Sequence, residues 1–421
     1  MGTELRSVRG THDILPEEHR LFDRVVDAAR EVCARYGFEP FSTPILEYTD
    51  VFKRTLGDAS DIVTKEMYTF EDRGGDSVTL RPEFTAGIAR SFITNGLAQK
   101  TPLKLWSHGP LFRYERPQKG RYRQFHQINA ESLGSADASA DVEVIVLAAD
   151  ILKELGLENK SRLEINSLGD AESRNAFRTE LVAFLSRFKN ELSEESRARL
   201  ERNPLRVLDS KDPADREILK NAPRLSDHYT AAARSFFESV KEGLEASGIR
   251  FHVSPTIVRG LDYYCHTAFE FTTELLGAQN AVLGGGRYDG LVEQMGGPKT
   301  PAVGFAAGLE RLALLLDAPA PLPRPVALIP IGPAAERKAY GLARSLRASG
   351  MPIELLFGAN PGKRLQKASK KNAVAAVLFG DDELADGTLK LKSLDSGAER
   401  AIQAAELESS LRAEINNAPR P

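Results

Sequence analysis

Polar and apolar positions alternate along two arms of the chain that are joined by a short loop, over residues 104–134. Side chains two positions apart on a strand share a face. One such face holds Leu105, Ser107, Gly109, Leu111, Arg113 and Glu115 on the first arm, and Arg121, Arg123, Phe125, Gln127, Asn129 and Glu131 on the return arm. The loop at 116–120 is basic and contains turn residues. The pattern predicts a β-hairpin that carries long polar side chains.

Two interpretations fit this hairpin. Arg113 and Arg121 lie on opposite arms and would suit a polyphosphate, because a guanidinium stays charged and binds phosphate oxygens in pairs. Phe125 would then stack on a base, and Glu131 would accept a hydrogen bond from a small polar substrate. The alternative is an amphipathic hairpin whose charges only pair with one another at the surface.

A strand that runs into a helix is predicted at residues 79–86, with Pro82 suited to the helix start. Glu83 and Thr85 would lie beside the positive end of that helix. A carboxylate in this place would pair with a substrate ammonium group. On spacing alone, the simpler alternative is that Glu83 only caps the helix.

Helical and strand periods alternate through the rest of the first 320 residues. A helix is predicted from Pro16 to a stop at Gly37, because apolar residues recur on one face between them. Further predicted elements are a helix at 141–155, a strand at 162–167, strands within 259–272 and 281–283, and a strand that runs into a helix at 302–312. Residues 170–249 lack strand alternation and predict a helical insertion.

A proline-rich stretch at 318–325 predicts a linker and a domain boundary. Beyond it the pattern alternates between strands and helices, which predicts an α/β domain. The predicted strands are 326–331, 353–357, 373–379 and 388–394, and the predicted helices are 334–348, 362–371 and one at the end.

Composition narrows the class of protein. A chain of 421 residues suggests two or three domains, and it has neither the apolar run of roughly 20 residues that a membrane span needs nor an apolar secretory segment at its start. Cys33 and Cys265 are the only cysteines, so we expect no disulfide framework and no cysteine-based zinc site. The histidines lack a metal-binding spacing, so we expect no structural metal. The presence of only two cysteines fits a protein of the reducing cytoplasm.

Charge is unevenly distributed. The net charge is −3, but residues 322–421 carry 15 Lys or Arg and 11 Asp or Glu, so this part is at +4 and the remainder at −7. A local basic patch can bind RNA while the whole protein stays acidic. The basic residues of this part cluster at Lys363, Arg364, Lys367, Lys370 and Lys371. The alternative to an RNA-binding patch is that this cluster is only the solvent-exposed face of a helix.

Several of these segments resemble known sequence motifs. Arg113-x-Glu115 and Arg121-x-x-x-Phe125 resemble motif 2 of the class II aminoacyl-tRNA synthetases. Residues 259–264 (RGLDYY) and 284–290 (GGGRYDG) are similar to the two signature segments of the histidyl-tRNA synthetases. The stretches 38–47, with Pro44, and 302–312, with Arg311 and with Ala306 in place of the generic middle glycine, resemble motifs 1 and 3. The resemblance covers nearly the whole chain.

The resemblance implies an α+β class II catalytic core, a mostly antiparallel sheet flanked by helices, over 1–169 and 250–320. It also implies a helical insertion at 170–249 that leans over the tRNA acceptor arm, and a C-terminal α/β anticodon-binding domain at 326–421. The implied reaction is the ATP-dependent ligation of L-histidine to histidine tRNA through a histidyl-adenylate, with release of pyrophosphate and AMP. The implied partners are histidine tRNA, magnesium that accompanies ATP, and a second copy of the chain, which would pack at Pro44.

The resemblance also implies roles for single residues. The catalytic residues would be Arg259 and Arg113. The histidine-binding residues would be Glu83, Thr85, Gln127, Glu131, Tyr264 and Tyr288, with Glu131 and Tyr264 on the two imidazole nitrogens. The ATP-binding residues would be Arg113, Glu115, Arg121, Phe125 and Arg311. The contacts to the tRNA acceptor end would be Arg116, Gln118, Lys119 and Arg123.

Three alternatives remain open at this point. One is a synthetase-like regulatory subunit of ATP phosphoribosyltransferase, and another is an RNA-sensing domain that binds uncharged tRNA without catalysis. Such relatives lose catalytic residues, whereas this chain keeps Arg259, Tyr264 and Arg311, and it keeps the tail domain that the regulatory subunits lack. A third alternative is another class II specificity, such as threonyl or prolyl, against which the segment 259–264 argues.

Overall fold

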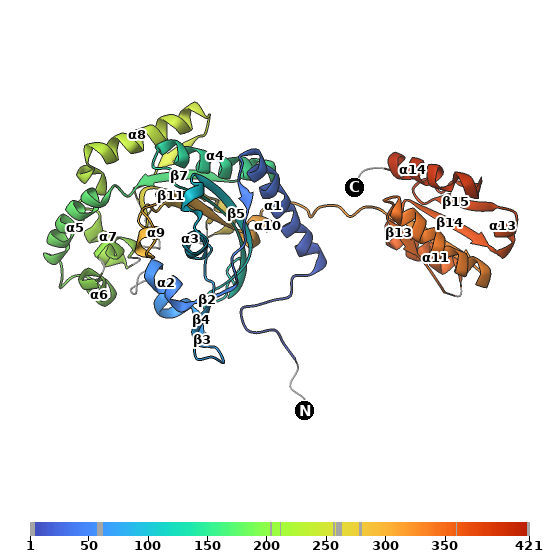
Figure 1. Ribbon diagram of the computed structural model, residues 1–421, viewed down its shortest axis with the longest axis horizontal. Helices are drawn as coiled ribbons and strands as arrows, with labels where there is room; N and C mark the ends of the chain where they lie inside the picture. Colours follow the sequence, from blue (N-terminus) through green and yellow to red (C-terminus); the bar gives the residue numbers. More distant parts are fainter. Residues whose placement is uncertain are drawn as a thin grey trace. The chain divides into compact units, whose positions relative to one another are not determined.

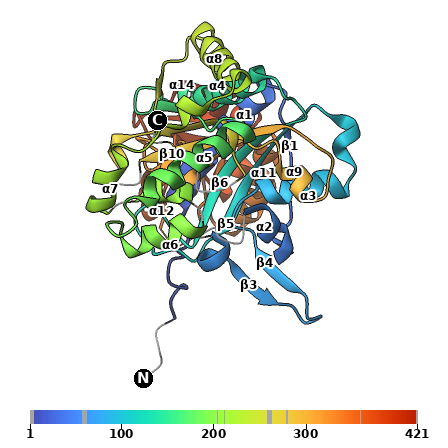
Figure 2. The same ribbon diagram turned by 90° about the vertical axis from the view of Figure 1, so that its left-hand side faces the viewer.

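The computed structural model describes residues 5–56, 62–202, 204–210, 212–255, 257, 263–277, 280–358 and 360–418. The chain divides into two compact units, Met1–Ala320 and Pro321–Pro421, and the boundary between them falls within the predicted linker (Figures 1 and 2). In the described part of the chain, no helix has both the length and the apolar character to cross a membrane.

The first unit is built on an eight-stranded sheet in the order β1-β5-β6-β11-β10-β9-β7-β8. Its inner pairs are antiparallel, and only the outermost pairs, β1 with β5 and β7 with β8, are parallel, which confirms the predicted fold class. The strands are β1 (Glu39–Pro40), β5 (Leu103–Phe112), β6 (Gln124–Leu133), β7 (Arg162–Ser167), β8 (Phe251–Val253), β9 (Cys265–Thr272), β10 (Ala281–Arg287) and β11 (Ala302–Gly308).

Helices α1 (Pro16–Arg35), α4 (Ala138–Glu154), α8 (Ala231–Ala246) and α10 (Leu309–Ala313) belong to the largest core cluster (Figure 1). Alternate residues of the strands point into this cluster, among them Ile128 and Ala130 of β6. Because side chains alternate along a strand, residues 127, 129 and 131 point to the opposite face.

The opposite face is covered by α2 (Thr49–Leu56), α3 (Thr85–Thr94) and α9 (Leu291–Gln294), which share a second core cluster. A small antiparallel sheet, in the order β2-β4-β3, lies beside them and projects from the unit in both views (Figures 1 and 2). Its strands are β2 (Leu46–Tyr48), β3 (Tyr68–Glu71) and β4 (Ser77–Leu80). Pro82, expected at the helix start, instead lies in the turn between β4 and α3.

The predicted insertion contains α5 (Ala171–Ser186), α6 (Glu194–Arg202), α7 (Pro213–Leu219) and α8. A separate small core joins its first helices, through residues such as Phe177 and Leu181. In contrast, α8 places Phe237, Val240 and Leu244 in the main core, because these residues share one helical face that packs against α4. The short helices of the first unit are η1 (Ile62–Glu66), η2 (Leu97–Lys100), η3 (Pro204–Asp209), η4 (Leu225–His228) and η5 (Glu274–Leu276).

The second unit has a five-stranded sheet in the order β13-β12-β14-β15-β16, with helices around it. Arg364, placed in the predicted basic patch, is buried and donates hydrogen bonds to the carbonyls of Pro330 and Leu356, so the exposed patch is made of lysines. The elements are β12 (Val326–Ile331), α11 (Pro333–Ala348), β13 (Ile353–Leu355), α12 (Pro361–Lys370), β14 (Ala375–Gly380), α13 (Asp381–Ala385), β15 (Thr388–Ser393), β16 (Glu399–Gln403), η6 (Ala404–Glu406) and α14 (Leu407–Asn417).

Candidate active site

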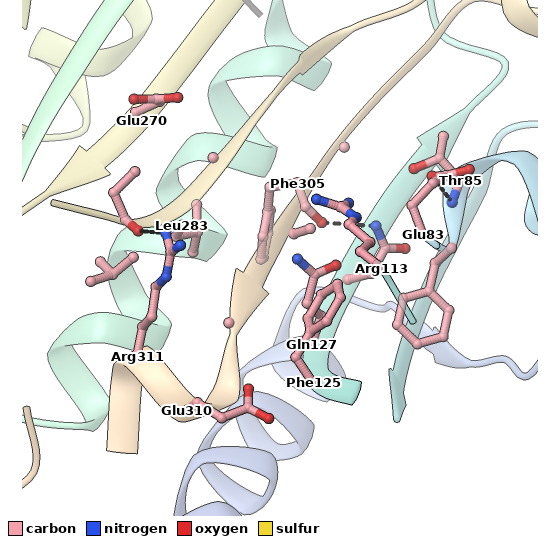
Figure 3. A pocket seen from close by; sticks show the side chains of 18 of the residues that line it. Glu83, Thr85, Arg113, Phe125, Gln127, Glu270, Leu283, Phe305, Glu310 and Arg311 are labelled. Carbon is pink, nitrogen blue, oxygen red and sulfur yellow. Dashed lines mark hydrogen bonds between the residues drawn. The ribbon is translucent and has the colours of Figure 1, made fainter. Parts of the chain in front are cut away.

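A cavity of about 350 Å³ opens on the face of the large sheet that turns away from the main core. Four alternate residues of β6 line it, as the period of two predicts: Phe125, Gln127, Asn129 and Glu131. Figure 3 shows the carboxylate and hydroxyl of Glu83 and Thr85 at one side of the cavity and the guanidinium of Arg311 at the other. The cavity therefore has an acidic part and a cationic part.

Glu131 lies at the centre of the acidic part. Its carboxylate accepts hydrogen bonds from Thr85 Oγ1 at 2.6 Å, from Asn129 Nδ2 at 3.0 Å and from the hydroxyl of Tyr288. Burial raises the pKa of Glu131 to about 7, despite these three donors. Gly304 on the neighbouring strand makes room, since a Cβ atom there would lie 1.6 Å from Glu131 Oε2.

Glu83 is the second buried carboxylate. It accepts hydrogen bonds from the backbone N–H groups of Thr85 and Ala86, at 2.6 and 2.7 Å, and so caps α3. Burial raises the pKa of Glu83, while these N–H groups and Arg113 oppose the rise. Glu83 therefore satisfies N–H groups at the start of the helix and also lines the cavity, so the structure is compatible with both interpretations of this residue.

Three arginines bring positive charge to the cavity, Arg311 and Arg121 in its cationic part and Arg113 beside Glu83 (Figure 3). Arg113 Nε donates to the Pro82 carbonyl at 3.0 Å, and its guanidinium lies 5.2 Å from the Phe125 ring centroid. Arg311 Nη1 donates to the Ala281 carbonyl at 2.6 Å, and Arg121 pairs with Glu115.

Burial lowers the pKa of all three arginines. The charges of Arg121 and Arg113 lower the pKa of Arg311 further. Like charges around one cavity are costly until an anion enters. The arrangement therefore favours a ligand with several negative charges.

Three tyrosines close the acidic part. The ring centroids of Tyr263 and Tyr264 are 4.6 Å apart, and the Tyr264 and Tyr288 rings meet edge to face at 6.4 Å. Tyr263 is buried and also lines the cavity. Tyr288 is anchored by its neighbour Arg287, which is fully buried and paired with Asp141.

The remaining predicted residues are not among the described residues that line the cavity. Arg259 falls outside the described residues. Arg116, Gln118 and Lys119 are exposed in the loop and do not line the cavity. Arg123 is held by the protein itself, since its guanidinium stacks 3.7 Å from the Tyr114 ring centroid and its Nε donates to the Glu115 carbonyl.

Some lining residues were missed by the sequence reasoning. Asn129 was placed on the correct face but given no role, although its Nδ2 donates to Glu131 and to the Phe305 carbonyl. Glu310 accepts from the backbone N–H of His126 at 2.8 Å. Glu270 carried a usable signal, because it is a charged residue inside the otherwise largely apolar strand β9.

Among the residues that the structure describes, no group of three or more His, Cys, Asp or Glu side chains is arranged to hold a metal ion. Cys33 and Cys265 are free and buried.

Comparison with known proteins gives independent evidence on the family of this chain. The family model for histidyl-tRNA synthetase matches residues 10–312, and the model for an anticodon binding domain matches residues 325–414. The histidine–tRNA ligase of Rhodospirillum rubrum is 55% identical over 408 residues, which cover 97% of this chain and 98% of the relative. That of Gluconacetobacter diazotrophicus is 53% identical over 400 residues, which cover 95% of this chain and 96% of the relative.

The crystal structure of apo S. aureus histidyl-tRNA synthetase is also similar, with a TM-score of 0.83 at 32% identity, and covers 97% of this chain and 99% of its own. The two family models match one unit each, since residues 10–312 lie in the first unit and residues 325–414 in the second. The chain belongs to the histidyl-tRNA synthetase family.

Proposed function

We propose that the acidic part of the cavity binds histidine and the cationic part binds the phosphates of ATP. The protein ligates L-histidine to histidine tRNA in an ATP-dependent reaction, the activity that accompanies the family and its close relatives. The observation that carries the assignment is the convergence of four buried carboxylates and three arginines on one cavity, with Glu83 and Glu131 forming its acidic part. Its size and its two parts suit an amino acid held beside a polyphosphate.

The first step joins the two substrates. An oxygen of the histidine carboxylate attacks the α-phosphorus of ATP, the bond to the bridging oxygen breaks, and pyrophosphate leaves with that electron pair. Such a transfer needs alignment and stabilisation of developing charge more than covalent help from the protein. We assign Arg113 and Arg259 to the α-phosphate and Arg311 to the γ-phosphate. Arg121 would contact the outer phosphates, and Phe125 would stack on adenine.

The second step transfers the histidyl group. The terminal ribose hydroxyl of the tRNA attacks the carbonyl carbon of the histidyl-adenylate, and AMP leaves. We assign Arg116, Gln118 and Lys119 to the acceptor end because they are exposed on the loop that borders the cavity. Arg123 would support this loop, since it is stacked on Tyr114. The second unit would bind the anticodon, with its exposed lysines as phosphate contacts.

Recognition of histidine follows from paired hydrogen bonds. Imidazole has two ring nitrogens, each able to make one directed hydrogen bond. We assign Glu131 and Tyr264 to these nitrogens, with Tyr288 orienting Glu131. Glu83, Thr85 and Gln127 would bind the ammonium group. An apolar amino acid would leave the buried Glu131 carboxylate without its ligand, which is a strong basis for rejection.

Magnesium enters with ATP as part of the substrate. Hard oxygen ligands suit it, and the Glu115 and Glu270 carboxylates on the cavity wall are of this kind. A cytoplasmic location fits the two free, buried cysteines.

We also propose that two copies associate through the small sheet. Leu46, Tyr48 and Phe70 lie on one face of it and are 48%, 61% and 48% exposed. The other face of β2 turns Glu47 inward to pair with Arg90 of α3. Such an apolar sheet face suits a partner surface. Light scattering should give the wild-type protein a molar mass in solution twice that of one chain. The variant Tyr48→Asp should instead have the molar mass of a single chain.

Histidine-dependent exchange between ATP and pyrophosphate tests the catalytic assignment. Without tRNA, we expect exchange with histidine alone among the twenty amino acids, and its loss in Arg113→Ala and Arg311→Ala. Arg116→Ala is the matched control, because this exposed arginine lies outside the cavity and should keep full exchange while charging of tRNA falls. Exchange with another amino acid, or normal exchange in Arg113→Ala, would contradict the assignment.

A further inference from the structure

One hydrogen-bonded cluster joins the helical insertion to the catalytic sheet, in addition to the packing of α8 in the main core. Asp170 caps α5 by accepting from the Ser173 N–H at 2.8 Å, and it also accepts from the Thr230 hydroxyl at 2.5 Å. The Thr230 N–H donates to Ser173 Oγ at 3.0 Å, and Thr230 Oγ1 caps α8 by accepting from the Ala233 N–H. The first and last helices of the insertion therefore start from one hydrogen-bonded cluster.

This cluster holds the start of β9. The backbone N–H of His266 donates to the Gly169 carbonyl at 2.9 Å, and the Leu168 N–H donates to the His266 carbonyl at 2.6 Å. The His266 ring lies 4.7 Å from that of Phe236 on α8. His266 has φ +46°, a left-handed conformation that a non-glycine residue adopts only where its surroundings hold it.

Arg174 of α5 reaches furthest toward the cavity. Its Nη1 donates to the backbone carbonyl of Tyr264, although Arg174 itself does not line the cavity. The Tyr264 ring does line it, and it packs closely on β10, where a Cβ atom on Gly286 would lie 2.9 Å from Tyr264 Cδ1. A ring confined in this way follows any displacement of its backbone.

We infer that Arg174 is a positioning residue for histidine binding, which makes the insertion a support of the amino-acid pocket. The guanidinium fixes the Tyr264 carbonyl, and the fixed backbone sets the ring against the histidine side of the cavity. The inference rests on the proposed function, because it needs Tyr264 to contact histidine. The phosphate side should be affected less, because the cavity arginines are held by other partners: Arg113 by the Pro82 carbonyl, Arg311 by the Ala281 carbonyl and Arg121 by Glu115.

The test uses the full-length protein and three variants: Arg174→Ala, Arg174→Lys and Arg178→Ala. Arg178 is the matched control, because it is an exposed arginine one turn further along the same helix. In ATP–pyrophosphate exchange, histidine and ATP are varied separately. Arg174→Ala should raise the KM for histidine about tenfold, which corresponds to about 1.4 kcal/mol, and should leave the KM for ATP within about twofold. The KM for histidine of Arg174→Lys should lie between those of the wild type and Arg174→Ala, because a lysine ammonium group can still donate to the Tyr264 carbonyl.

The outcomes separate the possible explanations. A merely structural role would lower the melting temperature and the active fraction, and hence kcat, without moving the KM for histidine; that result would overturn the inference. An equal rise of both KM values would overturn it as well. If Arg174→Ala does not fold, Arg174→Lys decides, and a KM equal to that of Arg178→Ala would refute the inference. Failure of the wild type to exchange with histidine would instead refute the proposed function.

Discussion

The substitution Glu131→Gln separates the functional role of this buried carboxylate from its energetic cost. Glutamine has nearly the same shape, and the hydroxyls of Thr85 and Tyr288 can turn to accept from its amide. The change therefore removes the charge while it keeps the packing. We expect a more stable protein that activates histidine poorly.

The magnitude follows from the pKa of Glu131, which burial raises from 4.5 to about 7. Between these values the folded protein holds a proton that the unfolded chain has released, so the stability of the wild type falls as pH rises through this window. A shift of this size corresponds to about 3 kcal/mol lost above pH 7. Glutamine carries no such cost, so the melting temperature of the first unit should rise by roughly 5 °C at pH 8.

Activity should move in the opposite direction. A hydrogen bond to a charged group contributes about 1.5–3 kcal/mol, so kcat/KM for histidine in ATP–pyrophosphate exchange should fall about 10- to 150-fold, while the KM for ATP stays near its wild-type value.

Thermal unfolding at pH 8 and pH 5 provides the check on the reasoning. The stability gain should shrink to roughly 1 kcal/mol or less at pH 5, near the lower end of this window, where the folded carboxyl is protonated and part of the unfolded population is protonated as well. An equal gain at both pH values, or lower stability than wild type at pH 8, would show that Glu131 does not bear this cost. Unchanged exchange kinetics would refute its contact with histidine.

Two further predictions concern residues outside the cavity. Asp215 is fully buried and accepts hydrogen bonds from the hydroxyls of three serines. Burial opposes the shift, but these hydrogen bonds lower the pKa of Asp215 from 3.8 to about 2. The ionised carboxylate therefore stabilises the folded protein above about pH 3.8, and this stabilisation is lost as the pH falls through 2. Thermal unfolding of Asp215→Asn at pH 7 should show a loss of about 2 kcal/mol, with both KM values unchanged. Gly10 has φ +85°, and a Cβ there would lie 2.7 Å from Arg123 Cγ, so Gly10→Ala should displace the loop and reduce tRNA charging about tenfold. Gly37→Ala, at φ +74° with open space around it, should only lose stability, by roughly 1 kcal/mol; equal charging by both variants would refute the loop contact.

Local pattern was enough to predict much of the fold. The limits of β7 and β12 were predicted to the residue, because each is a short strand-like run, continuous and apolar in β12, that is bounded by Pro, Gly or Ser. The period of two placed Phe125, Gln127 and Glu131 on one face. Strand β16 was missed, because its sequence, ERAIQ, has no clear alternation and forms a strand only beside β15.

The wrong predictions share a physical cause. Arg364 was assigned to a surface patch because its neighbours are lysines, yet it donates to carbonyls of other elements and is buried. Pro82 suited a helix start, but the carbonyl of Pro82 serves Arg113, and the helix begins later. In both places the residue bonds to a partner that is distant in sequence, and a local sequence pattern holds no information about such a partner.

The sequence by itself determined the two units, the strand face that lines the cavity and, through its motifs, the family. Each of these depends on spacing within a short segment. Only the tertiary structure decided that the pKa of Glu131 is raised to about 7, that Glu270 faces the same cavity, and that Arg174 holds Tyr264. Those properties depend on burial and on partners that are 90 residues apart for Arg174 and Tyr264 and 157 residues apart for Glu131 and Tyr288, which the folded chain brings together.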